Sequence, residues 1–192
     1  PVQRSILTGD TETGVTIMKV EKKLDAGPII NQKKIAILED DTSKEIFDKI
    51  IKFGQPLLIE TIKSVIENNH NFITQSNDQV SYASKIEKEE TRISWDQPAV
   101  IINRKIRAFN PTPGTWTKIK TLEKRIKIFK SKVISEEGIP KDKKKLGAVN
   151  EEFEVQCGEG FIKIIELQPE GKGRMNAIDF LNGLKIKEFI FE

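Results

Sequence analysis

One acidic side chain stands at a point where a strand gives way to a turn and where chemistry is possible. Asp25 lies in the segment Leu24-Asp25-Ala26-Gly27-Pro28, directly after a run that reads as a β-strand. Aspartate followed by small residues and proline favours a turn, because the carboxylate can accept hydrogen bonds from nearby backbone N–H groups. A carboxylate at the carboxyl end of a sheet strand can also orient a histidine or a water for general base catalysis. The residue types leave both interpretations open.

The other groups that could do chemistry have simpler structural interpretations. The single histidine, His70, lies among asparagines at the polar end of a predicted helix, which favours a solvent-facing or helix C-terminal position. The single cysteine, Cys157, sits on an apolar strand face and is interpreted as a small core residue. The glycine pairs of 158–160 and 171–173 lack the spacing of phosphate-binding loops and predict turns. We therefore predict no metal site.

The charge distribution divides the chain. Residues 1–99 carry 13 basic and 16 acidic side chains, whereas residues 100–192 carry 19 and 13. Within 101–145 there are 14 lysines and arginines against four acids, a local balance of +10. Such a field attracts polyanions, although a lysine-rich solvated surface would give the same count. Charge by itself does not establish RNA binding.

Length and composition indicate a globular protein. The 192 residues, of which 37% are hydrophobic, suffice for one ordinary core or for two small domains. One cysteine excludes an internal disulfide, and no apolar run approaches the roughly 20 residues that span a bilayer. We expect a cytoplasmic protein that does not contact the membrane. The chain opens at Pro1 without an initiating methionine, and we expect that a segment precedes it.

The first part of the chain reads as the end of an α/β unit. Residues 14–22 predict a strand packed on both faces, and 29–38 predict a second strand with an exposed or edge portion. A capping box at Thr42 predicts the start of a helix, and apolar residues keep helical spacing to about residue 69. Gly54 and Pro56 should kink that helix or split it in two.

A polar linker and a second, mainly β domain follow. Apolar periodicity is absent over 74–90, so we divide the chain into a first domain (1–73), a linker (74–95) and a second domain (96–192). In the second domain we expect a short helix with Asp96 as its N-cap and Pro98 in its first turn. Strands are predicted over 116–119, 125–134, 153–157, 161–167 and 185–191, with a hairpin turn at 158–160 and a helix over 176–182. This pattern suggests a small barrel of the oligonucleotide-binding (OB) type.

Several segments resemble the methionyl-tRNA formyltransferase family. Residues 3–18, from Gln-Arg-Ser-Ile-Leu-Thr-Gly-Asp-Thr-Glu-Thr-Gly onward, and Leu24-Asp25-Ala26-Gly27-Pro28-Ile29-Ile30 resemble the second half of the formyltransferase catalytic domain. Residues 82–86 and 88–95 resemble the family's linker, and 106–116 (Ile-Arg-Ala-Phe-Asn-Pro-Thr-Pro-Gly-Thr-Trp) resemble the opening of its C-terminal barrel. Residues 167–172 and Met175 are also similar. The implied fold is an incomplete Rossmann-like α/β formyltransferase domain plus an OB-like barrel with short helices.

The resemblance implies a reaction and assigns Asp25 to it. In this family a formyl group moves from 10-formyltetrahydrofolate, without a metal, to the amino group of initiator methionyl-tRNA, giving formylmethionyl-tRNA for translation initiation. Catalysis is attributed to an Asn, a His and an Asp; the Asp falls on Asp25, and the other two have no counterpart here. This chain is therefore expected to be inactive by itself. The resemblance also places one wall of the folate pocket at Glu21, Lys22, Lys23, Leu24 and Asp25.

The resemblance gives the basic cluster a role in binding tRNA. The residues implied to face the tRNA are Lys85, Lys88, Arg104, Arg107, Lys124, Arg125 and Lys127, within a cluster that also holds Lys105, Lys118, Lys120, Lys130 and Lys132. On strand 125–134, basic side chains should project from one face while Ile126 and Ile128 enter the core. Two alternatives stay open: a sugar-nucleotide formyltransferase, or a noncatalytic tRNA-binding fragment. The parent enzyme is expected to be monomeric.

Overall fold

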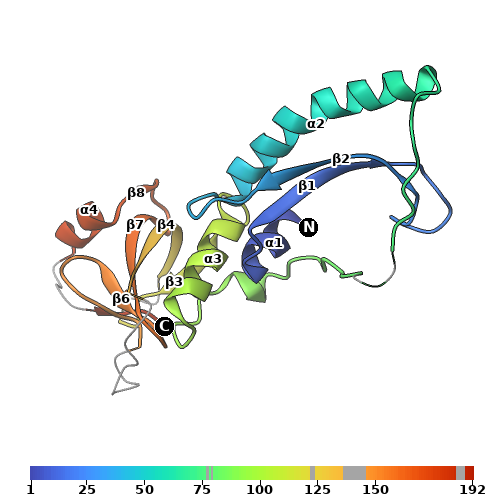
Figure 1. Ribbon diagram of the computed structural model, residues 1–192. Coiled ribbons are helices and arrows are strands. Elements are labelled where there is room, and N and C mark those ends of the chain that lie inside the picture. Colours follow the sequence, from blue (N-terminus) through green and yellow to red (C-terminus); the bar gives the residue numbers. More distant parts are fainter. Residues whose placement is uncertain (77, 79, 122–123, 136–145, 185–188) are drawn as a thin grey trace.

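The structure contains helices and strands in mixed order. A computed structural model describes residues 1–192 except 77, 79, 122–123, 136–145 and 185–188. Figure 1 shows a long hairpin with its helix joined through a short helix to a curled sheet. In chain order the elements are α1 (Val2–Thr8), β1 (Glu12–Met18), β2 (Ile29–Ala36), α2 (Ser43–Ile66), the 3₁₀ helix η1 (Glu89–Thr91), α3 (Ala99–Phe109), β3 (Thr115–Lys118), β4 (Arg125–Ser135), β5 (Ala148–Val149), β6 (Glu154–Gln156), β7 (Phe161–Pro169), β8 (Met175–Asn176), α4 (Ala177–Asn182) and β9 (Phe189–Ile190).

Strands β1 and β2 form a two-stranded antiparallel hairpin on which α2 lies. The expectation that the first strand is packed on both faces was wrong, because none of its residues is buried. Its half-buried side chains alternate along the strand. A Cβ atom added at Gly54 of α2 would lie 3.5 Å from the methyl groups of Val15. One face therefore meets the helix and the other is open. Strand β1 ends at Met18 rather than near Lys22, and β2 ends at Ala36 rather than Leu38.

Helix α2 begins where the sequence predicts and continues without a break. The capping box at Thr42 is present: Thr42 N–H donates to the Glu45 carboxylate at 2.9 Å. The predicted kink or split at Gly54 and Pro56 is wrong, since both lie inside one helix over Ser43–Ile66. Proline removes one backbone hydrogen bond, but buried positions stay in helical register from Ile46 to Leu57 on both sides of it.

The second sheet curls so that its two edge strands approach each other. Its strand order is β3-β4-β7-β6-β5-β9, with β8 paired to β7. An antiparallel bridge joins Ile119 to Phe191, and Lys120 N–H donates to the Ile190 carbonyl at 2.9 Å. These contacts connect the chain after β3 to β9 and bring the ends of the sheet together. Four predicted strands are found, with ends that differ from the prediction by at most two residues. Strands β5 and β8 were missed, and residues 185–188 of the fifth predicted strand lie outside the described residues.

Helix α3 lies against the curled sheet and begins differently from the prediction. Pro98, not Asp96, is its N-cap, and Ala99 N–H donates to the Glu159 carbonyl at 2.8 Å. The Asp96 carboxylate instead accepts a hydrogen bond from the Ser94 hydroxyl at 2.5 Å. A carbonyl from the β6–β7 turn thus takes the capping role that a side chain was expected to fill.

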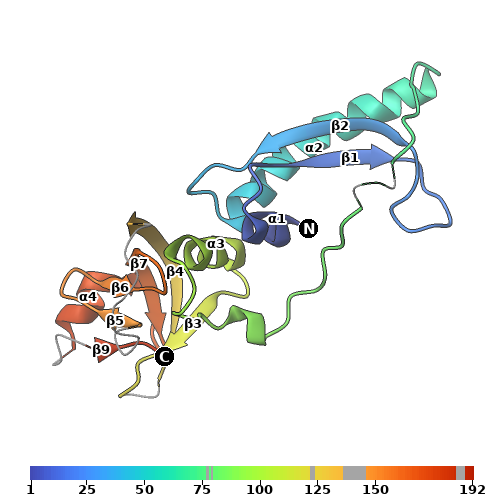
Figure 2. The same cartoon turned by 60° about the horizontal axis from the view of Figure 1, so that its bottom comes forward.

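Two hydrophobic cores meet at α3. Ile102 and Ile106 enter the core of the curled sheet, whereas Ala108 and Phe109 pack with Ile6 of α1 and Ile46 of α2. The views in Figures 1 and 2 agree that α3 lies between α1 and the curled sheet. Helix α3 therefore fixes the hairpin unit, which consists of α1, β1, β2 and α2, relative to the curled sheet. Helix α1 was not predicted.

The linker is held against α1 by the Arg4–Glu90 ion pair. Among its described residues it forms no helix before η1. The Arg4 guanidinium of α1 donates to both oxygens of Glu90, at 2.5 and 2.9 Å, and to the Ser84 and Lys85 carbonyls. These bonds hold the pKa of the Glu90 carboxyl at about 2, chiefly through Arg4 and then through the Glu87 N–H group. None of the described helices has both the length and the apolar character needed to cross a membrane.

Gly158 gives a test of how the β6–β7 turn docks on α3. A Cβ at Gly158 would meet the Asp96 carbonyl oxygen at 1.8 Å, whereas one at Gly173 would meet nothing within 4 Å. Gly158→Ala should therefore lower the free energy of unfolding by about 1–3 kcal/mol, the usual cost of forced overpacking. Gly173→Ala is the matched control and should stay within about 0.5 kcal/mol of the parent. Equal stabilities in urea denaturation would contradict the close approach.

The Arg4–Glu90 pair predicts a pH dependence of stability. The folded-state pKa of Glu90 lies below its ordinary value of 4.5, so the pair stabilises fully above 4.5 and its contribution is lost as the pH falls toward about 2. Because the Glu90 side chain is 35% exposed, we expect Glu90→Gln to cost only about 1 kcal/mol at pH 7. Glu12→Gln, in the more exposed Lys34–Glu12 pair, is the control. A Glu90→Gln deficit that stays constant from pH 7 to pH 3 would contradict the assignment.

Candidate functional site

Asp25 lies in the loop between β1 and β2. Its backbone has a φ of 52°, and its carbonyl, like that of Gly27, accepts a hydrogen bond from the Gln75 side chain, at 3.0 and 2.6 Å. Lys19 N–H donates to the Pro28 carbonyl across the neck of the loop. A Cβ at Gly27 would meet the Lys19 carbonyl oxygen at 1.8 Å, so this position accepts only glycine without rearrangement. The backbone of the loop is thus held while the Asp25 side chain is exposed.

The segment expected to wall the folate pocket forms the outer part of the same loop. Glu21, Lys22, Lys23, Leu24 and Asp25 are all exposed, and Leu24 is 87% exposed although it is apolar. Within the part of the chain that the structure describes, no hydrogen bond or ion pair involves the Asp25 carboxylate. The loop therefore presents backbone groups, one apolar side chain and one free carboxylate to whatever packs there.

His70 and Cys157 contribute little to this site. The His70 ring packs edge-on against Phe72 at 4.9 Å between centroids, the residue is half-buried, and its buried Nδ1 has no hydrogen-bond partner among the described residues. Cys157 is fully buried, as predicted, and burial raises the pKa of its thiol to about 12. Among the described residues no group of three or more His, Cys, Asp or Glu could hold a metal ion.

The basic residues of α3 are engaged within the chain. The Arg107 guanidinium donates to the Asp41 carbonyl at 2.9 Å, and Lys105 donates to the Arg92 carbonyl at 3.1 Å. Burial lowers the pKa of both side chains. The Arg104 guanidinium covers Gly9, where a Cβ would meet its Cζ at 2.3 Å. Arg104 and Arg107, expected to face tRNA, thus connect the two units.

The basic residues of β4 lie on the open face of the curled sheet. Arg125 and Lys127 are exposed, and so are Lys130 and Lys132. In a regular strand the odd-numbered and the even-numbered pair would point to opposite faces. The pairing of β4 with β7 shifts register between Ile128 and Ser131, which changes the alternation and keeps all four side chains outside. Lys124 is also exposed, as are Lys85 and Lys88 in the linker. The exposed Lys124, Arg125, Lys127, Lys130 and Lys132 form what we call the basic face. It is distinct from the basic residues of α3, which contact other groups of the chain.

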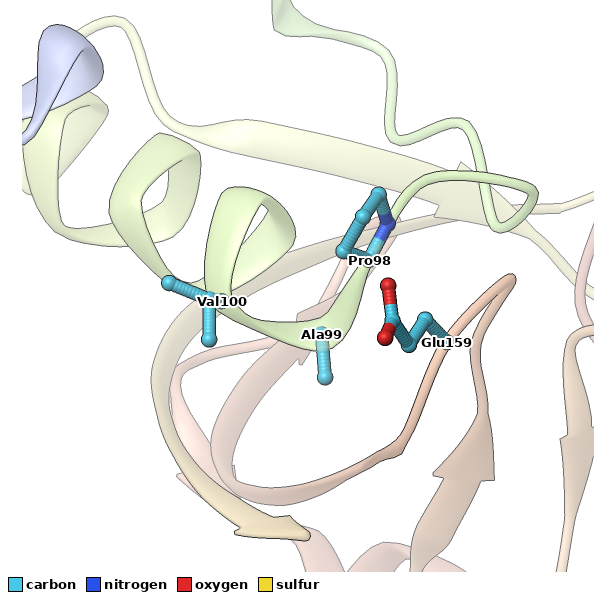
Figure 3. A pocket seen from close by; sticks show the side chains of 4 residues that line it. All are labelled: Pro98, Ala99, Val100 and Glu159. Atoms are coloured by element: carbon cyan, nitrogen blue, oxygen red, sulfur yellow. The ribbon is translucent and has the colours of Figure 1, made fainter. Parts of the chain in front are cut away.

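Two hollows lie on the curled-sheet unit. A cavity of about 130 Å³ at the start of α3 is lined by Pro98, Ala99, Val100 and Glu159, and Figure 3 shows the Glu159 carboxylate directed at the first turn of the helix. That carboxylate already complements the positive end of the helix. A larger hollow of about 300 Å³ lies on the basic face and is lined by Trp116, Arg125, Lys127, Gln168, Pro169, Glu170 and Gly171.

Comparison with known sequences gives consistent matches across both units. A methionyl-tRNA formyltransferase of Methylococcus capsulatus is 39% identical over 95% of this chain, and one of Bradyrhizobium diazoefficiens is 34% identical over 97%. The chain covers 58% and 59% of these two proteins, so it spans a little under three fifths of the curated relatives' length.

Solved structures share the fold at lower identity. HypX from Aquifex aeolicus in complex with tetrahydrofolic acid superposes with a TM-score of 0.67 at 17% identity, covering all of this chain and 36% of that one. An N-formyltransferase from Helicobacter canadensis in complex with folinic acid and dTDP-3-aminofucose gives 0.65 at 23%, covering 88% and 60%. At these identities the likeness shows the fold.

Family models match the two units separately. The model described as "Formyl transferase" matches residues 1–62, and the one described as "Formyl transferase, C-terminal domain" matches residues 85–185. The first match ends before the linker and the second begins within it, and the second covers more than half of the sequence. The chain therefore belongs to the formyl transferase family.

Proposed function

We propose that this chain is the C-terminal part of an enzyme that transfers a formyl group from 10-formyltetrahydrofolate to the amino group of initiator methionyl-tRNA. One observation carries the proposal: relatives with the methionyl-tRNA formyltransferase name align at 34–39% identity through the hairpin unit, the linker and the curled sheet together. A likeness to only one unit would not distinguish among acceptors. The chain's share of these relatives, and the exposed apolar residues Phe47, Ile51, Leu58 and Ile62 on α2, support a larger parent.

Asp25 is proposed to act on an imidazole supplied from outside this chain. A carboxylate beside a histidine favours the charged imidazolium, which can stabilise the oxyanion that forms as the amine attacks the formyl carbon. The free carboxylate of Asp25 and the fixed backbone of its loop fit that role. The exposed backbone of residues 21–25 is proposed to form one wall of the folate site, and the tetrahydrofolic acid complex of a protein with the same fold supports it.

The curled sheet is proposed to be an OB-type barrel that receives tRNA through phosphates. The bridge between Ile119 and Phe191 supports the barrel, since it joins the edges of the sheet. The exposed Lys124, Arg125 and Lys127 support the tRNA role, because flexible cations on an open sheet face can follow a phosphate backbone without reading bases.

A sugar-nucleotide acceptor is the competing proposal, and the charge distribution counts against it. Sugar formyltransferases share the fold with TM-scores of 0.65 and 0.64, at 23% and 24% identity. A small acceptor gives no reason for the local balance of +10 over 101–145. A noncatalytic tRNA-binding fragment remains compatible with the same basic face, and activity separates it from an enzyme part.

The isolated 192-residue chain should not formylate methionyl-tRNA at a measurable rate. The Asp25 carboxylate contacts no imidazole or amide in the described residues, and an oxyanion needs donors already in place. The measurement is transfer of the labelled formyl group of 10-formyltetrahydrofolate to the amino group of initiator methionyl-tRNA, with a full-length relative as the positive control. Sustained turnover that survives Asp25→Asn would show that the site is elsewhere.

Binding of tRNA to the chain should depend steeply on salt. Each phosphate contact contributes about −0.7 to −0.9 to the slope of log K against log [salt], so about four to six contacts predict a slope of about −3 to −5. Replacing Lys124, Arg125 and Lys127 together by alanine should weaken binding to initiator and elongator tRNA alike and flatten the slope by about 2 to 3.

The matched control for that experiment removes three charges from the other unit. Lys33, Lys52 and Lys63 are exposed on β2 and α2, and their joint replacement by alanine changes the net charge equally. It should leave the salt slope within about 0.5 of the parent value. Equal losses in both triple variants would mean that net charge, not the β4 face, attracts tRNA.

A further inference from the structure

The hollow on the basic face is built around an aromatic ring that lies outside the core. Trp116 of β3, Lys127 of β4 and Gln168 of β7 are paired neighbours across the sheet, so their side chains form one row on the open face. The row borders the hollow of about 300 Å³. That volume is large enough for a nucleobase with part of its sugar, and too small for a folded partner segment.

The two tryptophans of the chain differ in environment. Trp95 is 4% exposed, stacks on Phe191 at 5.3 Å and belongs to the core of the curled sheet. Trp116 is half-buried and is not a member of that core. Its Nε1 donates to the Thr91 hydroxyl at 3.0 Å, which sets the orientation of the ring. The ring is thus held in place by its edge while its faces are left to other groups.

Two guanidinium groups lie over the Trp116 ring. Arg125 lies 4.2 Å and Arg92 lies 5.6 Å from the ring centroid. An arginine held over an indole forms a planar, cationic surface on which a base can stack, or from which it can displace the guanidinium toward a phosphate. The backbone N–H and carbonyl of Arg125 are paired with Glu170, at 3.2 and 3.0 Å, so the start of β4 is fixed while the side chain is exposed.

The remaining lining supplies polar groups of both kinds. The Gln168 amide nitrogen donates to the Lys172 carbonyl at 2.7 Å, which leaves its carbonyl oxygen as an acceptor for an amino or imino group. The Lys127 ammonium donates to the Pro113 carbonyl at 3.4 Å, and its other N–H groups can donate to an anion. Pro169 supplies an apolar wall. The hollow therefore combines a π-face, two cations, the Glu170 carboxylate and an amide acceptor within one sheet row and its margin.

We infer that this hollow binds a single unpaired nucleotide of RNA, with its base stacked on the Trp116–Arg125 pair, its edge on Gln168 and a neighbouring phosphate on Lys127. A nucleotide matches all three kinds of group at once: the base has a π-face and hydrogen-bonding edges, and the phosphate has the charge. An acidic peptide would engage the cations and leave the indole and amide unused. The inference rests on the proposed RNA-binding function. That function involves contacts to phosphates only, and the inference adds one site that binds an unstacked base.

Tryptophan fluorescence of the whole 192-residue chain tests the inference. The probe is a single-stranded uridine hexanucleotide, and inorganic tripolyphosphate and hexaglutamate serve as anion controls. Stacking on Trp116 should quench its emission, while buried Trp95 is unaffected. Since base–aromatic stacking contributes about 1–3 kcal/mol per base, Trp116→Ala should weaken hexanucleotide binding, measured by anisotropy of a labelled probe, by about 5- to 150-fold.

Salt dependence separates stacking from charge. Trp116→Ala should lower affinity at every salt concentration without changing the slope, whereas Lys127→Ala should reduce the slope by about 0.7. Trp116→Phe keeps an aromatic surface and should bind within about threefold of the parent, which distinguishes a lost stacking surface from a damaged fold. Gln168→Ala should weaken binding by a few fold with both slope and quenching kept.

The inference is overturned if Trp116→Ala binds the hexanucleotide like the parent, or if tripolyphosphate or hexaglutamate binds with the same affinity and the same Trp116 dependence. It is also overturned if Trp116→Phe loses as much affinity as Trp116→Ala. Binding of tRNA with a steep salt slope but no Trp116 effect would refute the nucleotide site and leave the proposed function standing. Trp116-dependent hexanucleotide binding without any tRNA binding would support the nucleotide site and refute the proposed binding of tRNA.

Discussion

The structure depends on one helix that buries residues on two sides. Ile102 and Ile106 of α3 complete the core of the curled sheet, and Phe109, with Ala108, closes a second core with α1 and α2. A single rigid helix shared by two cores sets the orientation of the hairpin unit relative to the sheet, because neither core can shift without exposing apolar surface. Along the same boundary the Arg104 guanidinium covers Gly9 and Arg107 donates to the Asp41 carbonyl, which accounts for the half-burial of both cations. The linker then only has to connect two parts that α3 already positions.

Local signals in the sequence predicted the elements whose causes are local. The capping box at Thr42, the hairpin turn at 158–160 and the strands β4 and β7 were all read correctly in kind. The start of α3 was read wrongly for a different reason, because the Glu159 carbonyl that caps it lies far along the chain. The continuity of α2 through Pro56 and the open face of β1 were also not predicted. No local pattern around Asp96 announces that a carbonyl from residue 159 will cap the helix.

The candidate site also has features with local causes and features that depend on residues distant in sequence. The loop that carries Asp25 was found from its motif, and its conformation follows from local constraints at Gly27. The contacts of Arg104 and Arg107 within the chain could not be read from charge, because the groups that they contact in the hairpin unit are distant in sequence. Trp116 was noticed only as part of a motif. Its place on the open face follows from the pairing of β3 with β4, and the exposure of Lys130 and Lys132 follows from an irregular register that alternation cannot predict.

We propose two surfaces for the chain: a loop that offers a carboxylate, and a basic sheet face that receives RNA. Amide hydrogen exchange of the chain with and without initiator tRNA tests that division most directly. We predict added protection in β3, in β4 over residues 125–132 and in the turn after β7 at 169–172, with no change in the loop over 19–28. Protection confined to the hairpin loop or to α2, or the absence of any protection at low salt, would contradict the assignment of tRNA to the curled sheet.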